Sequence, residues 1–161
     1  MSDNIVNLFE KVRDIPYHCD VTRNPQNLFK KNRGSCFEKN VYLGNRLEDI
    51  GYDVKYMKAE FEWDKLPISD STLSLLDDKD SEHLFLEVKM EDRWISIDST
   101  FDSELEKAGF RVETDWDGKS DTIIAVPPDE ISEWRDIPKI IEVDDKLEFF
   151  TQLNRELEKK R

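Results

Sequence analysis

The chain has 161 residues, with 24 Lys and Arg against 37 Asp and Glu, and a formal net charge of −13. This length suits one domain with a hydrophobic core, so we predict a single domain over residues 1–161. So acidic a chain argues against nucleic-acid binding, and two cysteines are too few for a disulfide scaffold. With no long apolar run and no targeting segment, we expect a soluble, cytoplasmic protein with no membrane partner.

The negative charge is unevenly distributed along the chain. Residues 1–60 carry ten basic and nine acidic residues (+1), whereas the other 101 carry fourteen and twenty-eight (−14). Several basic residues cluster in sequence around Cys36, namely Arg23, Lys30, Lys31, Arg33 and Lys39. Such a cluster can lower the pKa of a thiol or attract an anionic substrate. It can also simply balance the acidic surface, which is the interpretation we favour.

The first third of the chain predicts two helices separated by a loop. Residues 3–13 place Ile5, Leu8, Phe9 and Val12 on one helical face. Residues 14–33 lack periodicity and contain Asn24-Pro25, which predicts a loop with one helical turn at 26–31. Residues 36–50 have helical spacing of their packable residues, which are Phe37, Val41, Gly44, Leu47 and Ile50.

The ends of this second helix are marked by its flanking residues. Ser35 and Glu38 have capping-box spacing, and Gly51 suits a left-handed C-cap. Cys36 therefore lies in the first turn, where free backbone N–H groups and the helix dipole favour a thiolate. The alternative is that Cys36 is a small, inert core residue.

A strand and a long loop follow. Residues 52–63 alternate with Met57, Ala59, Phe61 and Trp63 on one face, and the out-of-phase Val54 and Tyr56 predict a bulge near Tyr56. Residues 64–82 are polar and predict a mobile flap that borders the site, with a helical turn at 73–76. The six acids and two lysines of this loop would favour a cationic acceptor such as a lysine side chain or polyamine. A surface loop of no consequence is the alternative.

Residues 83–89 and 93–98 predict a hairpin around a tight turn at 90–92. If the turn is symmetric about the Met90–Glu91 bond, His83 lies directly opposite Asp98, with Cβ atoms about 5 Å apart. The opposite face is apolar, with Leu84, Leu86, Val88, Ile95 and Ile97. An Asp beside a His stabilises the imidazolium and fixes the tautomer, so His83 could activate a cysteine. A purely structural cross-strand hydrogen bond is the alternative.

The C-terminal part predicts a strand at 120–127, a weak strand at 112–113 and a short helix after Asp129. The last helix is predicted over 145–160, with Leu147, Phe150, Leu153 and Leu157 facing inward.

Two other uses of the cysteines are disfavoured. A zinc site from His18, Cys19, Cys36 and His83 lacks any C-x-x-C pair, and the adjacent His18–Cys19 is poor ligand spacing. A Cys19–Cys36 disulfide is unexpected in an intracellular chain. We therefore predict no metal and no bound cofactor.

The segments GSCFEK…LEDIGYDVKYM, EHLFLEV and RWISIDSTFD resemble the transglutaminase-like superfamily of papain-like folds over about residues 30–102. The resemblance implies an α+β domain with a papain-like core, in which the cysteine helix packs on an antiparallel sheet. It also implies that Cys36, His83 and Asp98 are the catalytic triad. The segment Cys36-x-Glu38-x-Asn40 resembles the arylamine N-acetyltransferases, although Arg33-Gly34-Ser35 is one residue shorter than their R-G-G-aromatic-C loop.

These features predict a cysteine-dependent acyl-transfer enzyme with a thioester intermediate, performing amide hydrolysis or transglutaminase-type transfer. The alternatives are an arylamine N-acetyltransferase-like acyltransferase and a non-catalytic interaction module with the same fold. The expected partner is a protein or small-molecule amide or thioester, with a cationic amine as acceptor. The Cys36 N–H can supply one oxyanion donor. Candidates for the second donor are Asn32, Gln26 and Tyr17.

Overall fold

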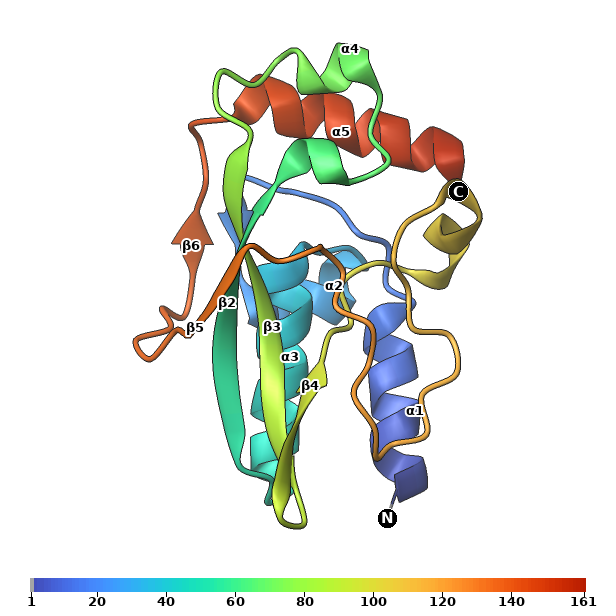
Figure 1. The fold of residues 1–161 in the computed structure, drawn as a ribbon, viewed down its shortest axis with the longest axis vertical. Helices are drawn as coiled ribbons and strands as arrows, with labels where there is room; N and C mark the ends of the chain where they lie inside the picture. Colours follow the sequence, from blue (N-terminus) through green and yellow to red (C-terminus); the bar gives the residue numbers. More distant parts are fainter. Residues whose placement is uncertain (1) are drawn as a thin grey trace.

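A four-stranded antiparallel sheet forms the centre of the computed structural model, which describes residues 2–161 (Figure 1). The strands lie in the order β4–β3–β2–β5, and their bounds are β2 Val54–Glu62, β3 Asp80–Met90, β4 Arg93–Ile97 and β5 Glu130–Glu133. A separate two-stranded sheet pairs β1 (Thr22–Arg23) with β6 (Ile141–Glu142). The predicted α+β class is confirmed.

Helices cover the sheet from different sides. The longest are α1 (Ser2–Arg13), α3 (Cys36–Asp49) and α5 (Leu147–Lys160), and the short ones are α2 (Leu28–Lys31), α4 (Asp70–Leu73), η1 (Pro25–Asn27), η2 (Trp63–Lys65) and η3 (Ser103–Ala108). Helix α3 runs along one face of β2 and β3, with α1 packed beside it (Figure 1). Helix α5 lies across the upper end of the sheet in Figure 1, next to α4. No helix within residues 2–161 is long and apolar enough to span a bilayer.

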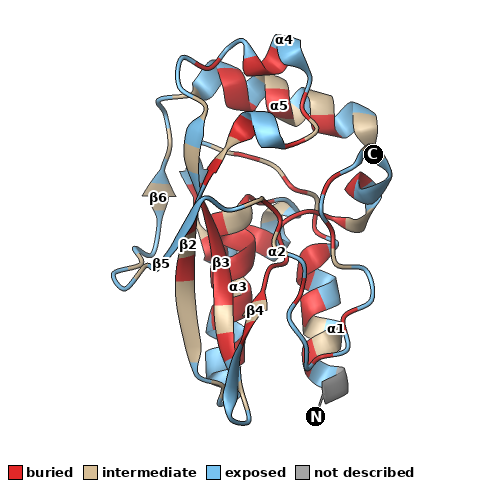
Figure 2. Cartoon of the chain, in the orientation of Figure 1, coloured by how far each residue is buried: buried red, intermediate tan, exposed pale blue. Residues whose placement is uncertain are grey.

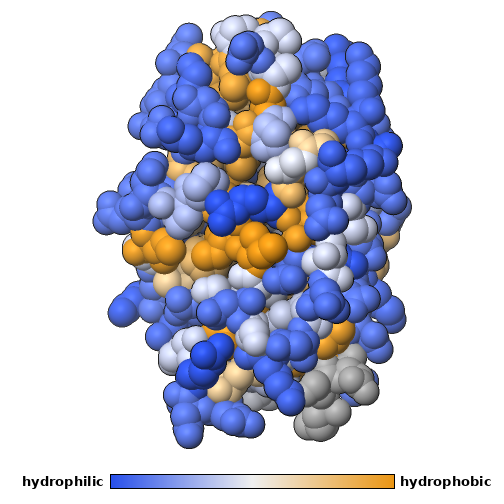
Figure 3. Space-filling model, turned by 45° about the vertical axis from the view of Figure 1, so that its right-hand side comes forward, coloured by the Kyte–Doolittle hydropathy of each residue, from blue (hydrophilic) through white to orange (hydrophobic). Residues whose placement is uncertain are grey.

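The core lies on both faces of the sheet, and the most deeply buried segments are α3 and the middle of β3 (Figure 2). Toward α1 and α3 the sheet contributes Leu86, Val88, Ile95 and Ile97. Toward α5 it contributes Met57, Ala59, Phe61 and Phe85, which pack with Phe149, Phe150, Leu153 and Leu157. The surface seen in Figure 3 is mostly polar, with apolar side chains gathered in a band across the middle and upper part.

The bulge predicted in β2 is wrong. Pairing with β3 is continuous from Val54↔Val88 to Glu62↔Asp80. Tyr56 faces α3, where a Cβ added to Gly44 would lie 2.7 Å from the Tyr56 ring. The out-of-phase apolar residues therefore reflect a strand that packs on both faces, and not an extra residue.

The hairpin forms, but its predicted register is wrong by two residues. Leu86 pairs with Ile97 and Met90 with Arg93, so the turn is Glu91–Asp92, with Glu91 at φ 56°. His83 is therefore not directly opposite Asp98. Because side chains alternate with a period of two, a two-residue shift keeps every side chain on its predicted face. The apolar face predicted for the hairpin is thus correct.

The C-terminal predictions are partly wrong. Residues 120–127 and 112–113 form no strand, and β5 replaces the short helix expected after Asp129. The final helix is confirmed as α5, but Leu147 is 54 % exposed, because it is the first residue of the helix and lies beyond the core contact. In the N-terminal part, the two predicted helices and the turn near 26–31 are confirmed, whereas β1 was not predicted.

The segment 64–82 is packed, which corrects the prediction of a mobile flap. Its apolar residues Leu66, Ile68, Leu73 and Leu76 are buried. The Ser69 hydroxyl donates to the Glu156 carboxylate of α5 (2.7 Å), as does the Thr72 hydroxyl (2.6 Å). The helical turn lies at 70–73, three residues before the predicted position, because Ser69 caps it.

Candidate active site

Cys36 is the first residue of α3, and its position is fixed by the residues before it. The Ser35 N–H donates to the Glu38 carboxylate (3.2 Å), so the predicted capping box forms. The Gly34 N–H donates to the Pro16 carbonyl (3.1 Å), and the His18 N–H donates to the Gly34 carbonyl (3.0 Å). The strand-like segment 16–18 therefore holds the chain that leads into the first turn.

The first turns of α3 meet β3 at an edge that β4 leaves unpaired. Pairing with β4 stops at Leu86↔Ile97. Two residues before Leu86 on β3, the backbone of Leu84 has no partner on β4. Its carbonyl instead accepts a hydrogen bond from the Asn40 side-chain amide (2.8 Å). The Leu84 backbone N–H also helps to lower the pKa of the Cys36 thiol. The early end of β4 thus gives a helix residue access to the backbone of the sheet.

His83 and Asp98 form a buried pair beside Cys36. His83 Nε2 and Asp98 Oδ2 are 2.6 Å apart, and the two residues are 3 % and 4 % exposed. The other ring nitrogen, Nδ1, is left for Cys36, whose charge, together with that of Asp98, raises the pKa of His83. The structure therefore brings all three predicted triad residues together, although the register differs from the predicted one.

The Asp98 carboxylate accepts several further hydrogen bonds. Oδ2 also accepts from the Ala125 N–H (2.9 Å). Oδ1 accepts from the Asn40 amide (3.1 Å), and from both the N–H and the hydroxyl of Thr100. A carboxylate with this many donors stays ionised. Residues 120–127, predicted as a strand, instead supply donors to Asp98.

The pKa values in the group shift toward a thiolate and an imidazolium. Burial raises the pKa of Asp98, but the charge and hydrogen bond of His83 outweigh it, so the net shift is downward. Burial lowers the pKa of His83, yet the charges of Asp98 and Cys36 raise it to about 10. Burial likewise raises the pKa of Cys36, and the charge and hydrogen bond of His83 reverse this to a net lowering. Both shifts therefore favour a Cys36 thiolate beside a protonated His83.

Asn40 is a residue of this site whose contacts the sequence did not indicate. It lies one helical turn after Cys36 and is fully buried. Its amide donates to Asp98, and its carbonyl oxygen accepts from the N–H (2.9 Å) and hydroxyl (2.8 Å) of Ser99. The signal available in the sequence was an Asn at i+4 from Cys36, on the same side of the helix.

The three candidates for the second oxyanion donor differ in position. Gln26 lines a hollow with Asn45 and Glu48, away from Cys36. Asn32 ends α2 with a left-handed backbone (φ 53°) and does not line the cavity that contains Cys36. Tyr17 is buried, and burial raises its pKa, together with the nearby charges of Cys19 and Cys36. Tyr17 does not line that cavity either, but it is the candidate whose pKa is raised by the charge of Cys36.

The basic residues near Cys36 in sequence do not form one positive patch. Lys31 and Arg33 pair with Asp20, at 2.8 and 3.0 Å. Lys39 is fully buried and donates to the carbonyls of Arg13, Ile15 and Thr100, and burial lowers its pKa to about 7. Of the five basic residues that cluster around Cys36 in sequence, Arg23 alone lines the cavity that contains Cys36.

This cavity has a volume of about 200 Å³. It is lined by Arg23, Cys36, Phe37, Ser81, Glu82, His83, Leu84, Trp134, Ile141, Val143, Asp145, Lys146 and Phe150. Trp134 directly follows β5, and the last five belong to or flank β6 and the start of α5. Space of this size accommodates a few non-hydrogen atoms, below the range for drug-sized ligands.

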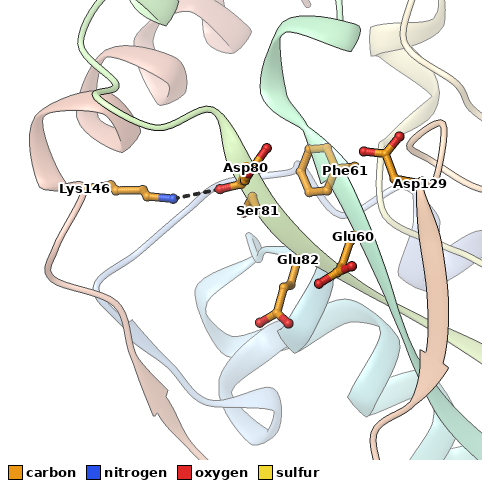
Figure 4. A pocket seen from close by; sticks show the side chains of 7 residues that line it. All are labelled: Glu60, Phe61, Asp80, Ser81, Glu82, Asp129 and Lys146. Carbon is orange, nitrogen blue, oxygen red and sulfur yellow. Dashed lines mark hydrogen bonds between the residues drawn. The ribbon is translucent and has the colours of Figure 1, made fainter.

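A second hollow of about 430 Å³ adjoins the first and is acidic. Figure 4 shows the side chains of Glu60, Glu82 and Asp129 around it, with the Lys146 amine donating to the Asp80 carbonyl (3.3 Å). The charge of the neighbouring Glu130 raises the pKa of Glu60. Of the six acids in segment 64–82, only Asp80 and Glu82 line either hollow. The preference for a cationic acceptor that was predicted from all six acids therefore depends on these two.

Comparison with known proteins assigns the family. No curated protein matches the chain. A family model described as N-acetyltransferase matches residues 10–124, which is more than half of the chain and includes Cys36, His83 and Asp98. Members of the corresponding arylamine N-acetyltransferase family are enzymes with a papain-like Cys-His-Asp fold. The match favours the acyltransferase alternative over the transglutaminase or hydrolase interpretation, and the chain belongs to the N-acetyltransferase family.

Proposed function

We propose that this protein transfers a small acyl group from a thioester donor to an amine through an acyl thioester on Cys36. The observation that carries the proposal is the buried His83–Asp98 pair in the cavity of Cys36, because the charge of His83 favours a thiolate. A thiolate is the nucleophilic form of cysteine. The family match supports the choice of transfer over hydrolysis.

In the first half-reaction the Cys36 sulfur attacks the carbonyl carbon of the donor thioester. A new carbon–sulfur bond forms to Cys36, the bond to the donor thiol breaks, and His83 gives its proton to the departing thiolate. Asp98 holds the ring with Nε2–H toward the carboxylate, so that Nδ1 faces the sulfur. The Cys36 N–H and the Tyr17 hydroxyl are our candidates for stabilising the oxyanion.

In the second half-reaction an amine attacks the acyl thioester. Neutral His83 takes one proton from the attacking nitrogen, the carbon–sulfur bond to Cys36 breaks, and the product amide leaves. Cys36 and His83 return to the thiolate–imidazolium pair. The cavity of about 200 Å³ supports a short acyl group.

Intact-protein mass spectrometry after mixing with acetyl, propionyl and longer acyl thioesters tests this function. We expect one acyl group on the wild type and on Cys19→Ser, and none on Cys36→Ser. Adding a primary amine should discharge the acyl group as an amide. A protein that takes up no acyl group, although Cys36 reacts with a thiol reagent, would contradict the proposal and favour a non-catalytic module. Discharge only to water would favour a hydrolase.

A further inference from the structure

Arg23 is a buried cation in the wall of the Cys36 cavity. It lies on β1, is 8 % exposed, and its guanidinium carbon is 5.0 Å from the centre of the Phe150 ring. Nε donates to the Asp20 carbonyl (2.9 Å), whereas Nη2 is shielded from solvent and has no hydrogen-bond partner. The nearby Asp20 carboxylate pairs with Lys31 and Arg33 instead.

A buried guanidinium without an anionic partner is costly. The effective cost of burying an unpaired charge is several kcal/mol, so such groups are normally paired. Arginine presents its N–H donors in a planar fork that matches a carboxylate. An unpartnered Nη2 in a cavity wall therefore indicates a ligand that supplies the missing acceptor.

The other charged residues of the cavity do not supply it, since neither Glu82 nor Asp145 forms an ion pair or hydrogen bond with Arg23. Glu82 pairs with Lys58 (3.3 Å), on the neighbouring strand. The Lys146 amine donates to the Asp80 carbonyl on the side of the acidic hollow. The charge of Arg23 lowers the pKa of Cys36 less than His83 does, so Cys36 is mainly the partner of His83. Most of the remaining lining is apolar, with Trp134, Ile141, Val143 and Phe150.

We propose that Arg23 binds the carboxylate of a small substrate whose other end reacts at Cys36. This proposal rests on the proposed acyl transfer, because it concerns which acyl donors or amine acceptors the protein prefers. Two sources of the carboxylate share this chemistry. It can be the far end of a short dicarboxylic acyl group on the donor, or the acid group of an amino acid acceptor. The volume of about 200 Å³ limits either one to a few carbon atoms.

Alkylation of Cys36 tests the anion site without any need for turnover. Iodoacetate and iodoacetamide are nearly isosteric and differ in charge, so the ratio of their rates reports an anion-binding group near the sulfur. We expect Arg23→Met to lower the iodoacetate-to-iodoacetamide ratio about tenfold or more, as expected for loss of a charge-assisted hydrogen bond. Arg23→Lys should retain part of the ratio. The matched control Arg33→Met, whose guanidinium pairs with Asp20, should leave it unchanged.

The wild-type protein provides a second measurement that does not depend on folding of the variant. Glutarate should protect Cys36 from iodoacetamide, and glutaramide should not. An iodoacetate-to-iodoacetamide ratio that is equal in wild type and Arg23→Met, or equal protection by both compounds, would overturn the proposal. If the charge preference holds but no thioester acylates Cys36, the acyl-transfer function fails and the anion site stands.

Substrate pairs then identify the source of the carboxylate. A succinyl thioester is compared with a butyryl thioester for acylation of Cys36, and β-alanine with propylamine for discharge of the acetylated protein. We expect the carboxylate to raise the rate about tenfold in one of the two comparisons, and Arg23→Met to remove that advantage. No advantage in either comparison would show that Arg23 does not select substrates.

Discussion

Replacing Asp98 by Asn tests the electrostatics of the site most directly. Each carboxylate oxygen accepts at least two hydrogen bonds, so either orientation of the amide turns its NH₂ group toward existing donors. With NH₂ toward His83, Nε2 must become the acceptor and Nδ1 carries the proton. The imidazole then cannot take a proton from Cys36, and the charge that raises the pKa of His83 is lost.

The size of the expected fall in alkylation rate follows from the pKa that Cys36 has without a protonated His83. Burial, the largest influence on its pKa, is then no longer offset by an imidazolium, so the thiol returns to about 8.5 or higher. At pH 6.5 such a thiol is about 1 % thiolate, so the alkylation rate should fall by up to about 100-fold relative to a thiol that is mostly ionised. Turning the amide NH₂ group toward existing donors should also reduce the free energy of unfolding by roughly 1–3 kcal/mol.

The assay is the pH dependence of iodoacetamide alkylation of Cys36, with urea unfolding measured in parallel. The wild type should react with a midpoint below the ordinary thiol pKa, and Asp98→Asn with a midpoint at or above it. Asp117→Asn is the matched control, because Asp117 caps an exposed turn away from Cys36. If a folded Asp98→Asn protein keeps the wild-type midpoint, the Asp98–His83 pair does not activate the thiol.

Three more outcomes are expected. Cys36 should be alkylated much faster than Cys19 near neutral pH, because burial raises the pKa of Cys19 to about 11; equal labelling by mass spectrometry would refute an activated Cys36. Gly44→Ala should destabilise the fold by about 1–3 kcal/mol in urea, since the new Cβ would lie 2.7 Å from the Tyr56 ring, whereas an increase in stability would mean that the ring moves freely. Asn40→Leu should remove the side-chain donor to the Leu84 carbonyl and one of the donors to Asp98, and so raise the midpoint of Cys36 alkylation; an unchanged midpoint would limit Asn40 to a structural role.

The parts of the site that the sequence predicted depend on local signals. The capping box and Gly51 define α3, and therefore the place of Cys36, within a few residues along the chain. Alternation places His83 and Asp98 on one face of the hairpin. Since this assignment survives a two-residue change of register, the pair was predictable although the turn was not.

The parts that the sequence did not predict depend on long-range contacts of polar or irregular segments. Residues 120–127 have strand-like composition, but the Thr122 N–H donates to Ser96 and the Ala125 N–H to the Asp98 side chain, so no ladder forms. Strand β5 is exposed along its whole length and shows no apolar alternation to reveal its pairing with β2. Such pairings depend on where the rest of the fold brings the segment.

Part of the wall of the Cys36 cavity, most of it apolar, lies in a different stretch of the chain from the reacting residues. Cys36, His83 and Asp98 lie within the matched residues 10–124, whereas Trp134, Ile141, Val143 and Phe150 lie after them. Substrate selection can therefore diverge while the reacting group stays intact, and residues 127–146 form a natural unit for exchange between relatives. Chimaeras that swap this unit should change the preference for the apolar part of the substrate, and keep the thiol reactivity and the Arg23-dependent charge preference of the recipient.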